Sequence, residues 1–287
     1  MRFKVICLMI FSFLQVSGAW ALEICGDLKQ GELVLIKNID AEKIIISEGE
    51  KDTKYNIGSD KSVLVALHRD APQKNELHIY SSKAPEIIYD LNIMPVKWDV
   101  QRVNGVSQHK VSPQSVHQKE IEREREDVNK ALSTYSNYNF WQEEFIEPIK
   151  GRRINGHFGY QRIFNGIPRN PHNGTDISAP EGTEVHASGS GKVILSGKDY
   201  FYTGNMIIID HGAGLQTIYA HLQKSAVAVG DMVKKGDVIG YVGKTGRATG
   251  PHLHWGASLN GIRFRPHSLL NINKKGCKTL QDKDGGK

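Results

Sequence analysis

Beyond its first twenty-one residues, the sequence has no long apolar run, no internal repeat and no low-complexity tract. No later segment is therefore expected to cross a bilayer as a helix, which requires about 20 consecutive apolar residues. Hydrophobic residues make up 39% and charged residues 24% of the 287 residues, which excludes a disordered chain and a membrane bundle. The formal net charge of +6 favours attraction to polyanions but does not indicate which polyanion. The length is typical of about two domains.

Residues 1–21 have the pattern of a secretory signal peptide. Two basic residues are followed by an almost wholly apolar stretch at 5–16, and Ala19 and Ala21 are the small residues that a signal peptidase requires. We expect cleavage after Ala21, which places the mature protein outside the cytoplasm with no stable membrane insertion. An uncleaved anchor is the alternative, and a lipoprotein is disfavoured because an acidic residue stands two positions before Cys25.

The three cysteines agree with an oxidising compartment. Cys7 would leave with the signal peptide, so the mature chain keeps only Cys25 and Cys277, near its two ends. An even pair in such a compartment predicts one disulfide that ties the ends together. Two unpaired thiols are the alternative.

The segment after the signal peptide reads as a small β domain, expected over residues 22–105. Its β-branched runs are separated by turn formers, and they predict strands at residues 32–37, 43–47, 62–68 and 76–80. Strands at this spacing indicate a small antiparallel β-sandwich. Nothing in this segment resembles a catalytic site.

A helical linker is expected over residues 106–150. Residues 118–132 are rich in helix formers, and their few apolar side chains form a stripe at spacings of three, four and seven. We expect a connecting helix with one side laid on a domain, and we expect its charged residues, including Glu124, to face solvent.

A second β domain is expected over residues 151–273, followed by a C-terminal tail at 274–287. Most of the glycines and eight of the twelve histidines lie after residue 150. Apolar runs punctuated by glycine predict strands at residues 184–187, 191–195, 206–210, 215–222, 237–242 and 252–255. The fold class is therefore mainly β, with an antiparallel sandwich, a connecting helix and a glycine-rich antiparallel sheet.

Five residues of this second domain could carry chemistry. His172 and Asp176 lie four residues apart across a glycine, His221 lies near the end of a strand-like run, and His252 and His254 alternate on another. Two histidines and one carboxylate are a recurrent ligand set for catalytic zinc, which keeps a fourth position open. Alternate residues of a strand face the same way, so one of the last two histidines can bind metal while the other stands beside it. The spacing does not tell which.

These motifs together resemble the LytM/lysostaphin-type zinc metallopeptidase domain. The similar segments lie at residues 158–162, 172–183, 208–214, 217–222, 229–236 and, most specifically, 243–255. The resemblance covers about residues 151–266, and the part before it is more vaguely similar to some proteobacterial members. One departure is the Gly256-Ala257 pair, since many members carry glutamate directly after the aromatic residue. That position is not a ligand.

The resemblance implies that one zinc ion is bound by His172, Asp176 and His254. It also implies that His221 and His252 are the catalytic histidines beside the metal. The chemistry would be metal-assisted hydrolysis of an amide, in which zinc polarises the scissile carbonyl and lowers the pKa of water.

Two further residues follow from the same comparison. Arg162 matches an arginine near the groove of the family, which implies a role in substrate positioning. His211 matches no ligand position and is expected to serve a turn. No ligand or catalytic position is missing, which argues against a degenerate, non-catalytic member.

The resemblance predicts a secreted endopeptidase that hydrolyses peptide cross-links of peptidoglycan. No wall-targeting repeat is present, which favours a periplasmic enzyme acting on D-alanyl–diaminopimelate bonds. The alternative is a non-catalytic peptidoglycan-binding or hydrolase-activating module of the same fold; a lipoyl-type carrier lacks its hairpin lysine here. We expect no nucleic-acid partner. The N-terminal domain could hold substrate, bind a regulatory protein or close the site.

Overall fold

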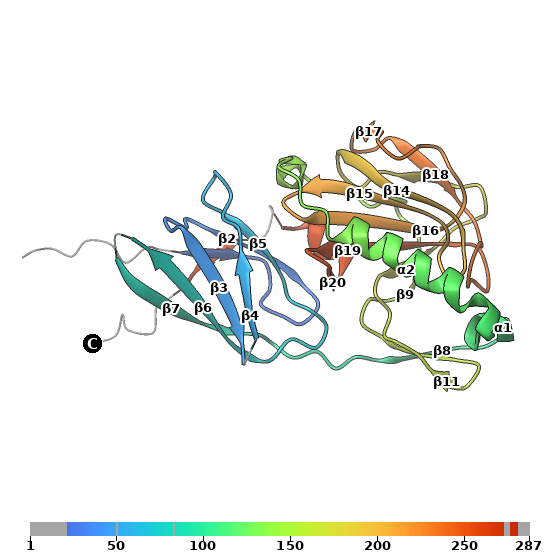
Figure 1. Cartoon of the computed structure of the whole chain (residues 1–287), viewed down its shortest axis with the longest axis horizontal. Coiled ribbons are helices and arrows are strands. Elements are labelled where there is room, and N and C mark those ends of the chain that lie inside the picture. Colours follow the sequence, from blue (N-terminus) through green and yellow to red (C-terminus); the bar gives the residue numbers. More distant parts are fainter. Residues whose placement is uncertain (1–21, 50, 83, 273–275, 281–287) are drawn as a thin grey trace, which may run out of the picture.

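The computed structural model describes residues 22–49, 51–82, 84–272 and 276–280. The predicted signal peptide at residues 1–21 lies outside this range. Figure 1 shows a β-sandwich beside a larger β domain, with one long helix lying across the larger domain. In the described part of the chain, no helix is both long and apolar enough to span a membrane.

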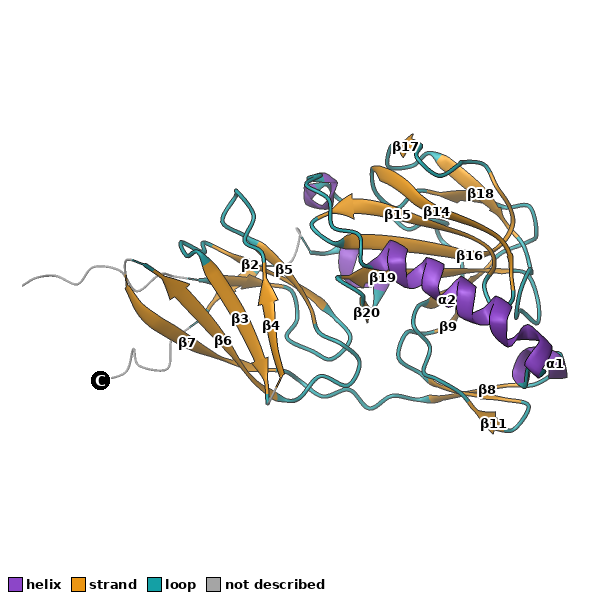
Figure 2. Ribbon diagram, in the orientation of Figure 1, coloured by secondary structure: helices purple, strands orange, loops and turns teal. Residues whose placement is uncertain are grey.

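The N-terminal domain is an antiparallel sandwich of two four-stranded sheets, as the sequence predicts (Figure 2). Their strand orders are β21-β1-β2-β5 and β4-β3-β6-β7. The strands are β1 (Glu23–Cys25), β2 (Leu33–Lys37), β3 (Lys43–Glu48), β4 (Lys51–Tyr55), β5 (Val63–Ala66), β6 (Lys74–Ser81), β7 (Ala84–Asn92) and β21 (Cys277–Thr279). Apolar side chains from both sheets form one shared core.

The sheet that contains β2 is buried on both faces. Val34 and Ile36 point into the sandwich core, whereas Leu33 and Leu35 join a second cluster that includes Phe264 of the larger domain. Because successive side chains of a strand point to opposite faces, a strand covered on both sides reads as a continuous apolar run. This sheet therefore docks the sandwich on the larger domain.

The two ends of the described chain meet in this docked sheet. Cys25 and Cys277 lie opposite each other in the β1–β21 register and form a disulfide. Residues 277–279, which fall in the tail expected from the sequence, thereby add an edge strand.

The connecting segment contains α1 (Gln108–Val111), η1 (Ser115–His117), α2 (Gln118–Leu132) and η2 (Phe140–Gln142). The long helix α2 has the bounds that the sequence predicts, and Ala131 and Leu132 pack on the sheet of the larger domain. Glu124 does not face solvent as expected. It is buried, and its carboxylate accepts a hydrogen bond from the backbone N–H of Phe201. The hairpin that contains Phe201 contacts this face of the helix, and burial raises the pKa of Glu124.

A small three-stranded sheet links the two parts of the chain. β8 (Val100–Val103) runs parallel to β10 (Gln161–Phe164), which pairs with β11 (Ile167–Pro168). The last strand within the predicted N-terminal range thus lies against the larger domain, where it forms part of the wall of a groove.

The larger domain is built on a ten-stranded sheet with the main order β17-β14-β15-β16-β19-β12-β9. β18 pairs with β13 and β16, and β20 pairs with β19. The strands are β9 (Ile154–Gly156), β12 (Thr175–Ser178), β13 (Glu184–His186), β14 (Gly191–Tyr200), β15 (Gly204–Gly212), β16 (Leu215–Ser225), β17 (Met232–Val233), β18 (Val238–Val242), β19 (His252–Leu259) and β20 (Ile262–Phe264), and η3 (Pro266–Leu270) follows.

The register of three adjacent strands positions the histidines. His254 on β19 lies opposite Asp176 on β12 and opposite Ala220 on β16. Leu253 points to the other face, where it is fully buried in the core. The pairing of these strands thus brings Asp176 and His254 close to the part of β16 that follows Ala220.

Candidate active site

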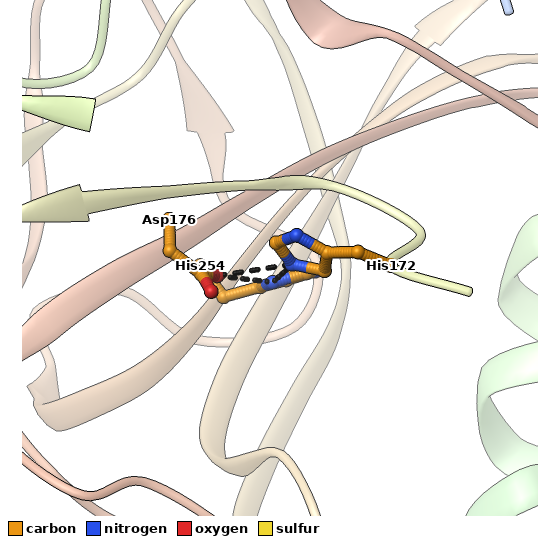
Figure 3. Close-up of side chains that lie close together, drawn as sticks. All are labelled: His172, Asp176 and His254. Atoms are coloured by element: carbon orange, nitrogen blue, oxygen red, sulfur yellow. Dashed lines mark hydrogen bonds and ion pairs between the residues drawn. The ribbon is translucent and has the colours of Figure 1, made fainter. Parts of the chain in front are cut away.

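Three side chains converge at one end of the central strands (Figure 3). Nε2 of His172 lies 3.0 Å from Nδ1 of His254, and Oδ1 of Asp176 lies 3.1 Å from the first atom and 2.9 Å from the second. All three residues are buried. Among the described residues, this is the one group of at least three histidine, cysteine or acidic side chains whose ligand atoms lie within 4.8 Å of one another.

The donor set fits a zinc ion. Nδ1 of His172 donates to the backbone carbonyl of His157 at 3.0 Å, and a carbonyl can only accept, so Nε2 of His172 is left with a lone pair. This lone pair, a ring nitrogen of His254 and a carboxylate oxygen meet in a buried space, where acceptor atoms repel one another unless a cation lies among them. Nitrogen and oxygen ligands of tetrahedral zinc lie roughly 3.3 Å apart, close to the separations observed.

The electrostatics keep these groups in the states that bind a metal. Burial lowers the pKa of His172 to about 4 and also lowers that of His254, so both rings are neutral at neutral pH. Burial alone would raise the pKa of Asp176. Interactions with His172, His254 and Arg162 outweigh it and hold that pKa well below its usual range.

Two glycines leave room for the converging side chains. A Cβ atom at Gly174 would lie 2.6 Å from the ring of His254, and one at Gly156 would lie 2.5 Å from Oδ2 of Asp176. Real Cβ contacts are essentially never shorter than 3.0 Å, so a side chain at either position would displace a candidate metal ligand. The sequence shows the first glycine between two candidate ligands, but the second has no local signal.

His221 and His252 stand next to this triad. Their ring centres are 4.7 Å apart, and the ring of His221 is 6.0 Å from that of His254. Nδ1 of His221 donates to the carbonyl of Thr245 at 2.9 Å, and Nδ1 of His252 donates to the carbonyl of Gly250 at 2.8 Å. Both rings, when neutral, therefore have an unprotonated Nε2.

The backbone of His221 is unusual. Its φ angle is 62°, in the left-handed region that non-glycine residues seldom adopt. The residue sits at an irregularity between β15 and β16, where the paired register shifts. Such strain is concentrated at functional sites, because surrounding contacts must hold the residue in place. Burial, with the neighbouring His252 and His254, lowers the pKa of His221 well below its usual range.

A surface groove opens over these residues. Its lining includes Asp176, His221 and His252 from the candidate site, and Gln101 with Val103 from β8. The lining also contains Arg162, Arg247 and the loop residues 248–251. The structure thus brings together the five residues chosen from the sequence. They are supported by groups that the sequence does not reveal, namely the side chain of Gln101 and the backbone carbonyls of His157, Thr245 and Gly250.

Arg162 contacts the site through Asp176. Its Nη2 donates to Oδ2 of Asp176, and its Nε lies 3.3 Å from the side-chain oxygen of Gln101. The guanidinium therefore holds the carboxylate oxygen that does not face the two imidazoles. Its role in positioning substrate stays a prediction.

His211 lies apart from the groove and is fully buried at the end of β15. Its Nδ1 donates to the carbonyl of Ser190 at 2.7 Å, and its Nε2 lies 2.7 Å from the hydroxyl of Thr217. His211 thus does more than serve the turn expected from the sequence, because it links the residue just before β14 to β15 and β16 through a buried polar network.

Comparison with known proteins assigns the domain that contains this site to a protein family. Residues 170–266 match the model of Peptidase family M23. The larger domain belongs to this family. The DD-carboxypeptidase/endopeptidase Mpg of Neisseria meningitidis is 44% identical over 124 residues, 43% of this chain and 28% of its own length. The peptidoglycan DD-endopeptidase ShyA of Vibrio cholerae is 41% identical over 122 residues, 42% of this chain and 27% of its own.

The M23 resemblance also extends over most of the fold. A structure assigned to peptidase M23 from Pseudomonas aeruginosa superposes with a TM-score of 0.63 at 25% identity, covering 86% of this chain and 96% of that one. This confirms the LytM/lysostaphin-type resemblance seen in the sequence. The chain spans little more than a quarter of the length of the curated M23 relatives named above.

Proposed function

We propose that this protein is a zinc-dependent endopeptidase that hydrolyses peptide cross-links of peptidoglycan, at D-alanyl–diaminopimelate bonds, in the periplasm. The observation that supports it most is the buried His172–Asp176–His254 group beside two further histidines in an open groove. The names of the M23 relatives, which are endopeptidases of peptidoglycan, support the substrate class.

His172, Asp176 and His254 would hold the metal. A zinc ion, when bound, supplies a Lewis acid that polarises the scissile carbonyl and acidifies water. The three side chains present Nε2, a carboxylate oxygen and Nδ1 from a loop, β12 and β19. Because two strands of one sheet carry two of these ligands, the site needs little rearrangement to bind its metal.

His221 and His252 would handle the protons of the reaction. Each presents an unprotonated Nε2 when neutral, since Nδ1 is held by a backbone carbonyl. Such a nitrogen accepts a proton as the water attacks and can return it to the leaving amine. After it gains that proton, the imidazolium stabilises negative charge developing on the carbonyl oxygen. The fixed tautomers and the short separation of the rings allow the two residues to share these tasks.

The periplasmic location is supported by the predicted signal peptide and by the disulfide. The signal-peptide pattern lies at residues 1–21, and disulfides persist in oxidising compartments such as the bacterial periplasm. Peptidoglycan is found there, so substrate and enzyme would meet.

Purified sacculi from a Gram-negative bacterium provide the test. The mature chain from Leu22, loaded with zinc, should convert cross-linked muropeptide dimers to monomers, followed by chromatography and mass spectrometry. A chelated sample and a His254→Ala variant should leave the dimers intact. If zinc binds stoichiometrically but no dimer is cleaved, the hydrolase proposal fails and a peptidoglycan-binding or hydrolase-activating module of the same fold takes its place.

A further inference from the structure

Arg247 lies in the loop between β18 and β19 and lines the catalytic groove. Its guanidinium carbon is 4.7 Å from the ring centre of Phe164 and 4.4 Å from that of Tyr202. Contact with two aromatic rings restricts the side chain, because a guanidinium is attracted to aromatic faces. The groove wall therefore carries a positioned cation, in the same lining as His221 and His252.

This cation has no anionic partner in the described part of the chain. After burial, the groups that influence its pKa are Tyr202 first and then Arg162 and Arg169, and these two arginines are themselves cations. Arg162 is paired with Asp176, and Arg169 donates to the backbone carbonyl of Val111. Burial lowers the pKa of Arg247 to about 10, so the guanidinium remains charged at neutral pH.

The groove as a whole carries an excess of positive charge. Among its lining residues, Arg162 and Arg247 are cationic, and Asp176 is the one carboxylate. That carboxylate is shared by Arg162 and the two imidazoles of the metal site. A partly buried charge without a partner is costly, and a guanidinium binds a carboxylate with paired hydrogen bonds.

We propose that Arg247 binds a free carboxylate on the substrate residue next to the scissile amide, and so determines which cross-links are cleaved. This inference rests on the proposed function and refines its substrate. In a D-alanyl–diaminopimelate bond, the carbon beside the amide nitrogen carries a carboxylate. A glycine bridge offers none inside the bridge. Arg247 therefore selects direct cross-links with an acidic residue over neutral bridges.

The test compares two peptide dimers that differ only in this carboxylate, one free and one converted to the carboxamide. For the wild-type mature chain loaded with zinc, kcat/KM should be about 10- to 100-fold higher for the free acid, as expected for a charge-assisted hydrogen bond. Arg247→Gln should lose this preference, because it should slow cleavage of the acid far more than cleavage of the amide. Arg247→Lys keeps the charge without the planar fork and should retain part of the preference.

Two controls separate recognition from structural damage. Arg152→Gln removes an exposed arginine outside the groove and should keep the full preference. Zinc content and melting temperature of each variant report whether the site and fold are intact. If Arg247→Gln slows both substrates equally, the residue only supports the groove and the inference is overturned.

The outcomes also distinguish this inference from the proposed function. A wild-type protein that cleaves acid and amide dimers at equal rates contradicts carboxylate recognition and leaves the endopeptidase proposal standing. A wild-type protein that cleaves neither, although zinc is bound, contradicts the proposed function itself. Binding of the free-acid product peptide, measured by calorimetry, should weaken in Arg247→Gln by a similar factor.

Discussion

The guanidinium of Arg162 donates to Oδ2 of Asp176, while Oδ1 of the same carboxylate faces the rings of His172 and His254. One oxygen of this carboxylate thus contacts a fixed cation, and the other faces the two histidines proposed to share a metal ion with it. Hydrogen bonds of this kind orient a ligand and keep it ionised, and losing one typically costs 10- to 100-fold in metal affinity.

Arg162→Gln should therefore weaken zinc binding by about 10- to 100-fold. The physical reason is that Asp176 loses both its orientation and the positive charge that lowers its pKa. Competition with a zinc chelator measures the affinity, with Arg152→Gln as the charge-matched control. Unchanged zinc affinity together with a raised KM would instead assign Arg162 to substrate positioning.

Substitutions in the two groups of histidines should have different effects on zinc binding. His221→Ala and His252→Ala should keep stoichiometric zinc but lose about 10²- to 10⁴-fold in kcat, the usual contribution of a general acid or base. His254→Ala should lose zinc. Elemental analysis of the purified variants and steady-state cleavage of a cross-linked dimer make the comparison. Loss of zinc in His221→Ala would place that residue among the ligands and refute the division.

Gly174→Ala should impair the metal site although it removes no ligand. The added methyl group would meet the His254 ring and the backbone oxygen of Trp255, both at 2.6 Å. We expect a clear loss of zinc affinity, whereas Gly276→Ala, where a Cβ meets nothing within 4 Å, serves as the matched control. If Gly174→Ala binds zinc like the wild type, the space at this position does not constrain the site.

His211 should make folding stability depend on pH. Burial lowers its pKa to about 4 in the folded protein, below the ordinary value of about 6.5 that applies to the unfolded chain. The unfolded state therefore binds more protons between these values. The stabilisation is complete above pH 6.5 and is lost as the pH falls towards 4, by about 3 kcal/mol.

Chemical unfolding of zinc-free wild type and zinc-free His211→Gln tests this. The variant should be less stable at pH 7 and should show a flatter decline between pH 6.5 and 4, because the other histidines titrate alike in both proteins. Equal slopes would mean that His211 does not carry this part of the pH dependence.

Much of this architecture could be predicted from local sequence patterns. The helix α2 was recognisable because its apolar residues recur at helical spacing. Six of the ten strands in the large sheet, β13 to β16, β18 and β19, were recognisable as apolar runs between glycines, whereas the short strands β9, β12, β17 and β20 were not. The β4 strand was not, because Lys-Asp-Thr-Lys-Tyr at 51–55 is a polar edge strand without apolar alternation. Glu124 was misjudged because its burial depends on a hairpin more than seventy residues away.

The residues that form the candidate site could be predicted from the sequence, but the groups that hold them in position could not. His252 and His254 share a face because side chains alternate along a strand, and this follows from spacing alone. The carbonyl of Thr245 that fixes the His221 ring does not follow, and neither does the contact of Arg162 with Asp176. Those relations arise from strand pairing between distant segments. The parallel pairing of β8 with β10, which brings Gln101 to the groove, is another such case.

The measurement that tests the account most directly is a zinc titration of the metal-free mature chain, with cleavage of cross-linked peptidoglycan dimers followed at each addition. The account predicts that the rate rises from zero in proportion to added zinc and reaches its plateau at one ion per chain, with no rise in the His254→Ala variant. Cleavage that persists in the metal-free chain, or zinc binding without any cleavage at the plateau, would contradict it.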